Sequence, residues 1–163
     1  MNTMRLGVTG HRSFLHHADI VASVDSVLDR VLDVEPPVGV VVVTSLAEGA
    51  DRLVAEMVLQ RGGMMQVILP LPAADYSTDF ETVDSRAEFD TLLDRAESVE
   101  ITIAPDTTRE AAYEAAGHAM VAASDIVIAL WDGTASRGRG GTAEIIQHAL
   151  DHNVPVEIVL VER

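Results

Sequence analysis

Apolar residues follow two alternating patterns along the chain: short continuous runs, and stripes that recur every three or four positions. The runs predict strands, and the stripes predict amphipathic helices. A strand covered by helices on both faces reads as a continuous apolar run, so the alternation predicts a parallel sheet between two helical layers. The predicted strands are residues 6–9, 38–43, 65–69, 99–103, 125–131 and 154–161, and the predicted helices are about residues 20–32, 49–60, 85–96, 109–123 and 142–152.

We therefore expect an α/β fold, a Rossmann-like three-layer α/β/α sandwich with a mainly parallel sheet. At 163 residues the chain is long enough for one domain with a sizeable core and short for two. We accordingly expect a single domain over residues 1–163. Apolar residues make up 48% of the chain and aromatic residues only 4%, so aliphatic side chains should form the core.

The hydropathy of the chain also predicts where the protein resides. No apolar run approaches the roughly 18 residues that a membrane span requires. The first 15 residues lack the continuous apolar core of a signal peptide. We expect a cytoplasmic protein that has no membrane partner.

Two residue types with distinctive chemistry are absent, because the sequence contains no cysteine and no lysine. Without thiols there are no disulfides, thiolate metal sites or cysteine nucleophiles. Without lysine there is no P-loop lysine and no Schiff base. His11, His16 and His17 lack the helical spacing and the neighbouring carboxylate of a metal site, so we expect no metal.

The net charge of −15 predicts long-range repulsion from nucleic acids, whose affinity for proteins comes mainly from neutralised phosphates. We therefore expect no nucleic-acid partner. A small anion held locally remains compatible with this charge.

The clearest candidate for such an anion site is the glycine-rich loop between the strand at 125–131 and the helix that begins near Thr142. The first N–H groups of a helix have no internal partner, and they carry the positive end of its dipole. Glycine lets a phosphate approach this backbone closely. Arg137 and Arg139 in the same loop can hold phosphate oxygens in bidentate fashion.

Two further loops follow the first and second strands, and in a parallel sheet all three lie on one edge. Glycine or threonine before a helix is often only a connection, but three such loops in one small chain favour a phosphate-bearing ligand. We expect a bound nucleotide or phosphate, with no other cofactor. The candidate binding residues are Thr9, Gly10, His11, Arg12, Ser13, Ser45, Glu48, Gly49, Asp51, Trp131, Asp132, Arg137, Arg139, Gly140, Gly141 and Thr142.

The stretches GVTGHR (7–12), TSLAEGADRLVA (44–55) and SDIVIALWDG…GRGGTAE (124–144) resemble the SLOG superfamily. This group includes cytokinin-activating phosphoribohydrolases, the DNA-processing protein A fold and molybdenum cofactor carriers. The resemblance runs from Leu6 to Val156. It implies a Rossmann-like fold whose glycine-rich loops bind a nucleotide or a nucleotide-derived ligand, as in a sensor or a carrier.

The same resemblance raises an alternative function, cleavage or transfer of an N-glycosidic bond. The phosphoribohydrolases and the nucleoside deoxyribosyltransferases both place a functional glutamate after a Gly-Thr pair. Glu144 is the corresponding catalytic candidate here, although it stands one residue earlier than in those families. A one-residue offset turns a helical side chain by about 100°. Stabilisation of the helix dipole is the other interpretation of Glu144.

Three aromatic residues and one helix leave alternatives open. Trp131, at the end of a strand, can stack on a base or pack in the core. Tyr76 and Phe80 can form a lid over the site or anchor a surface loop. The alanine-rich helix at 109–123 can pack against a symmetry mate, so a homo-oligomer, a dimer or larger, is expected.

Overall fold

The computed structural model of the chain describes residues 2–104, 106, 108–136 and 138–163. Its centre is a six-stranded sheet with the strand order β4-β3-β2-β1-β5-β6, and every pair of neighbouring strands is parallel. The strands are β1 (Thr3–Gly10), β2 (Gly39–Thr44), β3 (Met64–Leu69), β4 (Ser98–Ile101), β5 (Ile126–Trp131) and β6 (Val156–Leu160).

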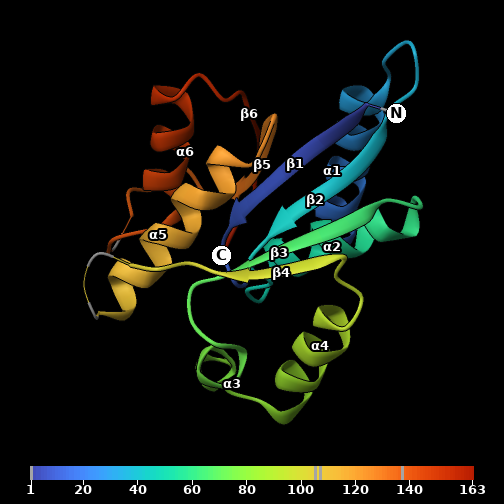
Figure 1. Cartoon of the computed structure of the whole chain (residues 1–163). Helices are drawn as coiled ribbons and strands as arrows, with labels where there is room; N and C mark the ends of the chain where they lie inside the picture. The colour runs from blue at the N-terminus through green and yellow to red at the C-terminus, as the bar shows by residue number, and fades with distance from the viewer. Residues whose placement is uncertain (1, 105, 107, 137) are drawn as a thin grey trace.

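Helices connect the strands and cover both faces of the sheet (Figure 1). The α-helices are α1 (His17–Leu32), α2 (Ala50–Gln60), α3 (Ala73–Tyr76), α4 (Val83–Leu93), α5 (Arg109–Ala122) and α6 (Thr142–Asp151), and a 3-10 helix, η1, spans Ser77–Asp79. Figure 1 shows α5 and α6 on one side of the sheet and α1 and α2 on the other.

The core has one apolar layer on each face of the sheet. Alternate strand residues such as Leu6 and Val42 pack with the stripes of α1 and α2, whose members include Val24, Leu28 and Val54. The opposite strand face packs with α5 and α6 through a smaller cluster, Val43, Ile68, Ala116, Met120, Val121, Val127, Ile145 and Ala149. Both layers consist mainly of aliphatic side chains, as the composition predicts.

The structure confirms the predicted α/β sandwich and its sequence of elements. It differs from the prediction mainly in residues 73–84, which lie outside the predicted helices and strands. This segment contains α3 and η1, and it buries Tyr76 and Phe80 almost completely. Together with Phe89 of α4 the two rings form a cluster with centroid distances of 5.1 to 5.6 Å. The two aromatics therefore anchor this segment to the core.

The connections leave β1 in the middle of the sheet with two different neighbours. The chain proceeds outward from β1 through β2 and β3 to β4, and α5 then returns it to the other side of β1 as β5. The loops after β1 and β5 consequently diverge to opposite faces. Such a switch point opens a crevice at the carboxyl ends of the strands, where ligands bind in open α/β sheets.

Within the described parts of the chain, no helix combines the length and the hydropathy that crossing a membrane would require.

Candidate functional site

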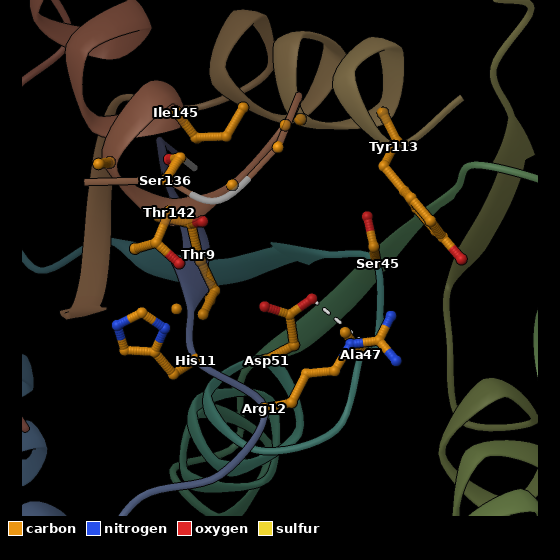
Figure 2. A pocket seen from close by; sticks show the side chains of 18 of the residues that line it. Thr9, His11, Arg12, Ser45, Ala47, Asp51, Tyr113, Ser136, Thr142 and Ile145 are labelled. Atoms are coloured by element: carbon orange, nitrogen blue, oxygen red, sulfur yellow. Dashed lines mark hydrogen bonds between the residues drawn. The ribbon is translucent and has the colours of Figure 1, made fainter. Parts of the chain in front are cut away.

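A pocket of about 440 Å³ lies at the switch point, at the carboxyl edge of the sheet (Figure 2). Loops after β1, β2 and β5 contribute to its lining, together with residues of α2, α5 and α6. Its size is within the range of small-molecule and cofactor sites. The predicted binding residues in its lining are Thr9, Gly10, His11, Arg12, Ser13, Ser45, Asp51, Arg139, Gly140, Gly141 and Thr142.

Backbone hydrogen bonds fix the loop after β1 between its two neighbours. The N–H of His11 donates to the carbonyl of Leu130 at 3.1 Å, and its carbonyl accepts from the N–H of Ala50 at 3.1 Å. Gly49 makes this approach possible, because a Cβ there would lie 2.4 Å from the carbonyl oxygen of Arg12. Gly49 also has a φ of 78°, which residues with a side chain rarely adopt. The beginning of α2 is thus docked against the end of β1.

The N-terminus of α6 supplies backbone donors at the opposite wall. Thr142 and Ala143, the first two residues of the helix, both line the pocket. The next N–H, that of Glu144, donates to the hydroxyl of Ser136 at 3.1 Å. Among the described residues, no acceptor is assigned to the N–H groups of Thr142 and Ala143. Such donors at the positive end of a helix dipole suit an anion.

Gly140 allows the loop before α6 to lie against α5. Its φ is 75°, and a Cβ there would come within 2.9 Å of the backbone nitrogen of Glu114. Because the loop follows α5 so closely, its backbone remains at the rim of the pocket.

The arginines predicted to hold phosphate have different surroundings. Arg12 has a half-exposed side chain, and its nearest ion-pair contact is a loose one of 4.0 Å with Glu48. Arg139 lines the pocket, but its guanidinium pairs with Glu114 of α5 at 3.1 Å and with Asp106 at 3.5 Å. Arg137 lies outside the described residues. The ion pair of Arg12 is therefore weaker than those of Arg139, and Arg12 is the more available of the two for a ligand.

Asp51 brings a buried carboxylate into the same pocket. It lies in the first turn of α2 with 7% of its surface exposed, and its Oδ2 accepts a hydrogen bond from the N–H of Ala47 at 3.2 Å. In Figure 2 the carboxylate points away from α2 towards the space between Thr9 and Ser45. Burial raises the pKa of Asp51 to about 6, although the Ala47 N–H and nearby Arg12 oppose that shift.

His11 and Asp132 connect the loops after β1 and β5. Nε2 of His11 lies 2.9 Å from Oδ1 of Asp132 and 3.1 Å from its backbone nitrogen. The shorter contact fits an N–H donor on Nε2, since a carboxylate is the stronger acceptor. The hydroxyl of Thr134 and the guanidinium of Arg163 also bind Asp132, and these donors hold the pKa of its carboxyl far below the usual range.

Several predicted site residues do not contribute to the lining of this pocket. Gly49 packs against the loop after β1, Glu48 accepts a 2.6 Å hydrogen bond from Ser85, and Asp132 is engaged by the neighbours described above. Trp131 donates its indole N–H to the carbonyl of Thr134 at 2.8 Å. Their role in the structure is to hold loops in place. Their contact with a ligand stays a prediction from the sequence.

Glu144 also lies outside the lining. Its carboxylate turns back along its own loop and accepts a hydrogen bond from the N–H of Gly140 at 2.7 Å. This contact closes the loop against the first turn of α6, where an acidic side chain also favours the helix dipole. The placement supports the structural interpretation of Glu144 and gives the catalytic one no support.

The lining includes residues that the sequence analysis did not select. From α5 come Tyr113, Ala116 and Gly117, and Ser136 and Arg163 approach from the loop after β5 and from the C-terminal end. The small residues of α5 matter because a Cβ at Gly117 would lie 2.4 Å from Cδ1 of Ile145 in α6. The alanine-rich pattern of this helix, which also predicts a surface for a symmetry mate, is the sequence signal for this close packing.

The histidines are placed away from any cluster of three ligands. His16 lies 3.2 Å from Glu162, and His118 stacks on His148 with ring centroids 3.7 Å apart. In the described part of the chain, no group of three or more histidine, aspartate or glutamate side chains has the geometry to hold a metal ion.

Comparison with known proteins gives matches only at the level of structure. No protein-family model matches the chain, and no curated protein matches it in sequence. The structure of DNA processing protein A from Streptococcus pneumoniae matches with a TM-score of 0.66 and 17% identity, over 96% of this chain and 50% of that one. DNA processing protein A from Helicobacter pylori matches with a TM-score of 0.62 and 15% identity, over 95% and 64%.

A third solved structure, that of a protein named TM1055, matches with a TM-score of 0.55 and 18% identity, over 94% of this chain and 72% of that one. The chain therefore spans only half to about two thirds of the two DNA processing proteins. At these identities the likeness establishes the fold. It confirms the Rossmann-like α/β fold that the sequence predicts.

The comparison corrects one expectation. The Helicobacter pylori structure is described by its single-stranded DNA binding mode, and it has the fold of this chain. The expectation of no nucleic-acid partner rested mainly on the net charge of −15, and this match contradicts it. Net charge is an average over the whole surface and does not describe the field at one pocket.

Proposed function

We propose that the pocket binds a nucleotide or a nucleotide-derived phosphate and that the protein acts as a sensor or carrier of this ligand. The observation that carries the proposal is the convergence of three loops and the N-terminus of α6 on one pocket at the switch point of the sheet. Backbone N–H groups at a helix start bind phosphate without needing lysine, which this chain lacks.

The lining offers different chemistry to different parts of such a ligand. The α6 end presents the N–H groups of Thr142 and Ala143, which suit a phosphate. Apolar and aromatic residues, among them Tyr113, Met120 and Ile145, form another part of the wall and suit a flat base. This mixture of a few directed polar groups with apolar surface is typical of ligand sites.

Titration calorimetry tests the proposal with defined probes. These are the four common nucleoside 5′-monophosphates, the matching unphosphorylated nucleosides, inorganic phosphate and a short single-stranded oligodeoxynucleotide. We expect at least one monophosphate to bind and its nucleoside to bind at least tenfold more weakly, a difference of about 1.4 kcal/mol. The expected reason is the loss of charged hydrogen bonds at the start of α6.

Arg12→Gln should weaken binding of that monophosphate about tenfold, because it removes positive charge from the pocket lining. Arg30→Gln is the matched control, since Arg30 lies on α1 and pairs with Glu157 outside the pocket. Binding by none of the probes would refute the proposal. If the oligodeoxynucleotide binds and no monophosphate does, the proposal is wrong and the pocket recognises single-stranded DNA instead.

A further inference from the structure

The two helices that begin at the pocket, α2 and α6, present opposite charges to it. At α6 the acidic side chain of the first turn, Glu144, is turned back to the N–H of Gly140. The pocket wall there consists of backbone donors. At α2 the acidic side chain of the first turn, Asp51, is part of the lining. The first N–H of α2, that of Ala50, already donates to the carbonyl of His11.

This difference predicts the orientation of a ligand in the pocket. A phosphate at the α2 end would lie beside a carboxylate, and like charges at close range repel strongly where water is scarce. The α6 end has no such carboxylate in the lining of the pocket. The anionic group of a ligand thus belongs at α6, and the α2 end must receive a group that donates hydrogen bonds.

The carboxylate of Asp51 has acceptor capacity that the protein itself does not use. A carboxylate offers about four acceptor positions on its two oxygens. Among the described residues, the N–H of Ala47 donates to Oδ2 at 3.2 Å, and the Thr44 hydroxyl and the Ser45 N–H lower the pKa of Asp51 by smaller amounts. A side chain that is 93% buried and faces a pocket is costly unless a donor satisfies it. The ligand is the natural source of that donor.

We propose that Asp51 accepts hydrogen bonds from the 2′- and 3′-hydroxyl groups of a ribose, so that the pocket selects ribonucleotides over 2′-deoxyribonucleotides. The inference rests on the proposed nucleotide binding and specifies its ligand class. Adjacent hydroxyls of a ribose offer two donors to one carboxylate. In this arrangement the sugar bridges Asp51 at α2 and the phosphate at α6, and Asp51 is a residue that determines specificity.

Titration calorimetry of the whole chain tests the inference, with the best-bound ribonucleoside 5′-monophosphate and its 2′-deoxy and 3′-deoxy counterparts as probes. The wild-type protein should bind the ribonucleotide at least tenfold more tightly than either deoxy form, because the missing hydroxyl leaves a buried acceptor unpaired. Asp51→Asn should reduce this preference to threefold or less while leaving affinity for the deoxy probes nearly unchanged. Asn keeps an oxygen for the N–H of Ala47, so the loop should stay intact.

Glu56→Gln is the matched control, because Glu56 lies on the same helix and outside the pocket lining. It should keep the full preference for ribose. Equal binding of ribo and deoxy probes by the wild-type protein, or an unchanged preference in Asp51→Asn, would overturn the inference but leave nucleotide binding in place. If no monophosphate binds at all, the proposed function itself fails, and the two failures are thereby distinguished.

Discussion

Asp51 illustrates at the scale of one residue how a binding pocket can reduce stability. Its pKa is raised to about 6 by burial, with Arg12 and Tyr76 as the charged and titratable neighbours. The folded protein therefore holds this proton more tightly than the unfolded chain, in which an aspartate has a pKa of about 3.9. Stability from this site is present at low pH and is lost as the pH rises from about 4 to above 6.

Asp51→Asn should remove this pH-dependent loss of stability, because asparagine does not ionise. We expect the free energy of unfolding to exceed that of the wild type by about 3 kcal/mol at pH 8, and by only about 1 kcal/mol at pH 4.5. Urea unfolding at the two pH values measures the difference. Asp19→Asn, which changes an exposed aspartate in the first turn of α1, should show no such dependence. A gain of equal size at both pH values would contradict the assignment of the raised pKa.

The structural role of Glu144 also belongs to the residue scale. The offset of one position relative to the resembling families led to two interpretations of this carboxylate. The sequence does not distinguish them, because the answer depends on where the side chain points. In the structure the Glu144 carboxylate accepts a 2.7 Å hydrogen bond from the N–H of Gly140. A short loop with several glycines has many possible paths, and residue types alone do not identify the one adopted.

At the scale of elements, the docking of α2 on the end of β1 depends on a glycine. Gly49 and Gly62 both have positive φ values, 78° and 83°. A Cβ at Gly49 would collide with the backbone of Arg12 at 2.4 Å, whereas a Cβ at Gly62 would have no heavy atom within 4 Å. A substitution at Gly62 therefore tests backbone conformation alone, whereas one at Gly49, whose ψ is −118°, adds close packing to the cost of its own backbone conformation.

We expect Gly62→Ala to lower the free energy of unfolding by about 1 kcal/mol, the usual cost of a left-handed conformation. Gly49→Ala should lower it by at least about 2 kcal/mol more, because the loop after β1 must move as well. Chemical denaturation of both variants gives the comparison. If the two substitutions cost the same, close docking of this loop against α2 is not a feature of the folded protein.

The elements themselves were predictable where apolar patterns were long enough to show a period. The stripe containing Ile20, Val24 and Leu28 gave α1, and the continuous runs gave β2 and β5. Residues 73–84 were not predicted, because α3 and η1 span only four and three residues. Such short helices show no periodicity, and their burial depends on the distant ring of Phe89.

At the scale of the whole molecule, the position of the site was easier to predict than the residues that line it. Parallel strands bring loops that are distant in sequence to one edge, so convergence follows from the fold class alone. Which side chains face the pocket depends on helix rotation and on contacts between loops. Tyr113 and Arg163 enter the lining in this way, and neither stands near a glycine-rich motif.

The net charge of the whole molecule affects how fast charged ligands arrive, but it does not exclude a class of ligand. The value of −15 predicts slow encounter with anions and a strong dependence on salt. It does not determine what one pocket binds, because net charge is an average over the whole surface.

The central claim is that a phosphate-bearing ligand binds where the N-terminus of α6 meets the loops after β1 and β2. Amide ¹H–¹⁵N spectra of the protein, titrated with the best-bound nucleoside 5′-monophosphate and with its nucleoside, test it most directly. We expect the largest shifts at residues 9–13, 45–51 and 138–143, and we expect the phosphate-dependent part to centre on Thr142 and Ala143. Shifts that leave these amides unchanged and fall elsewhere on the sheet or helices would contradict the account.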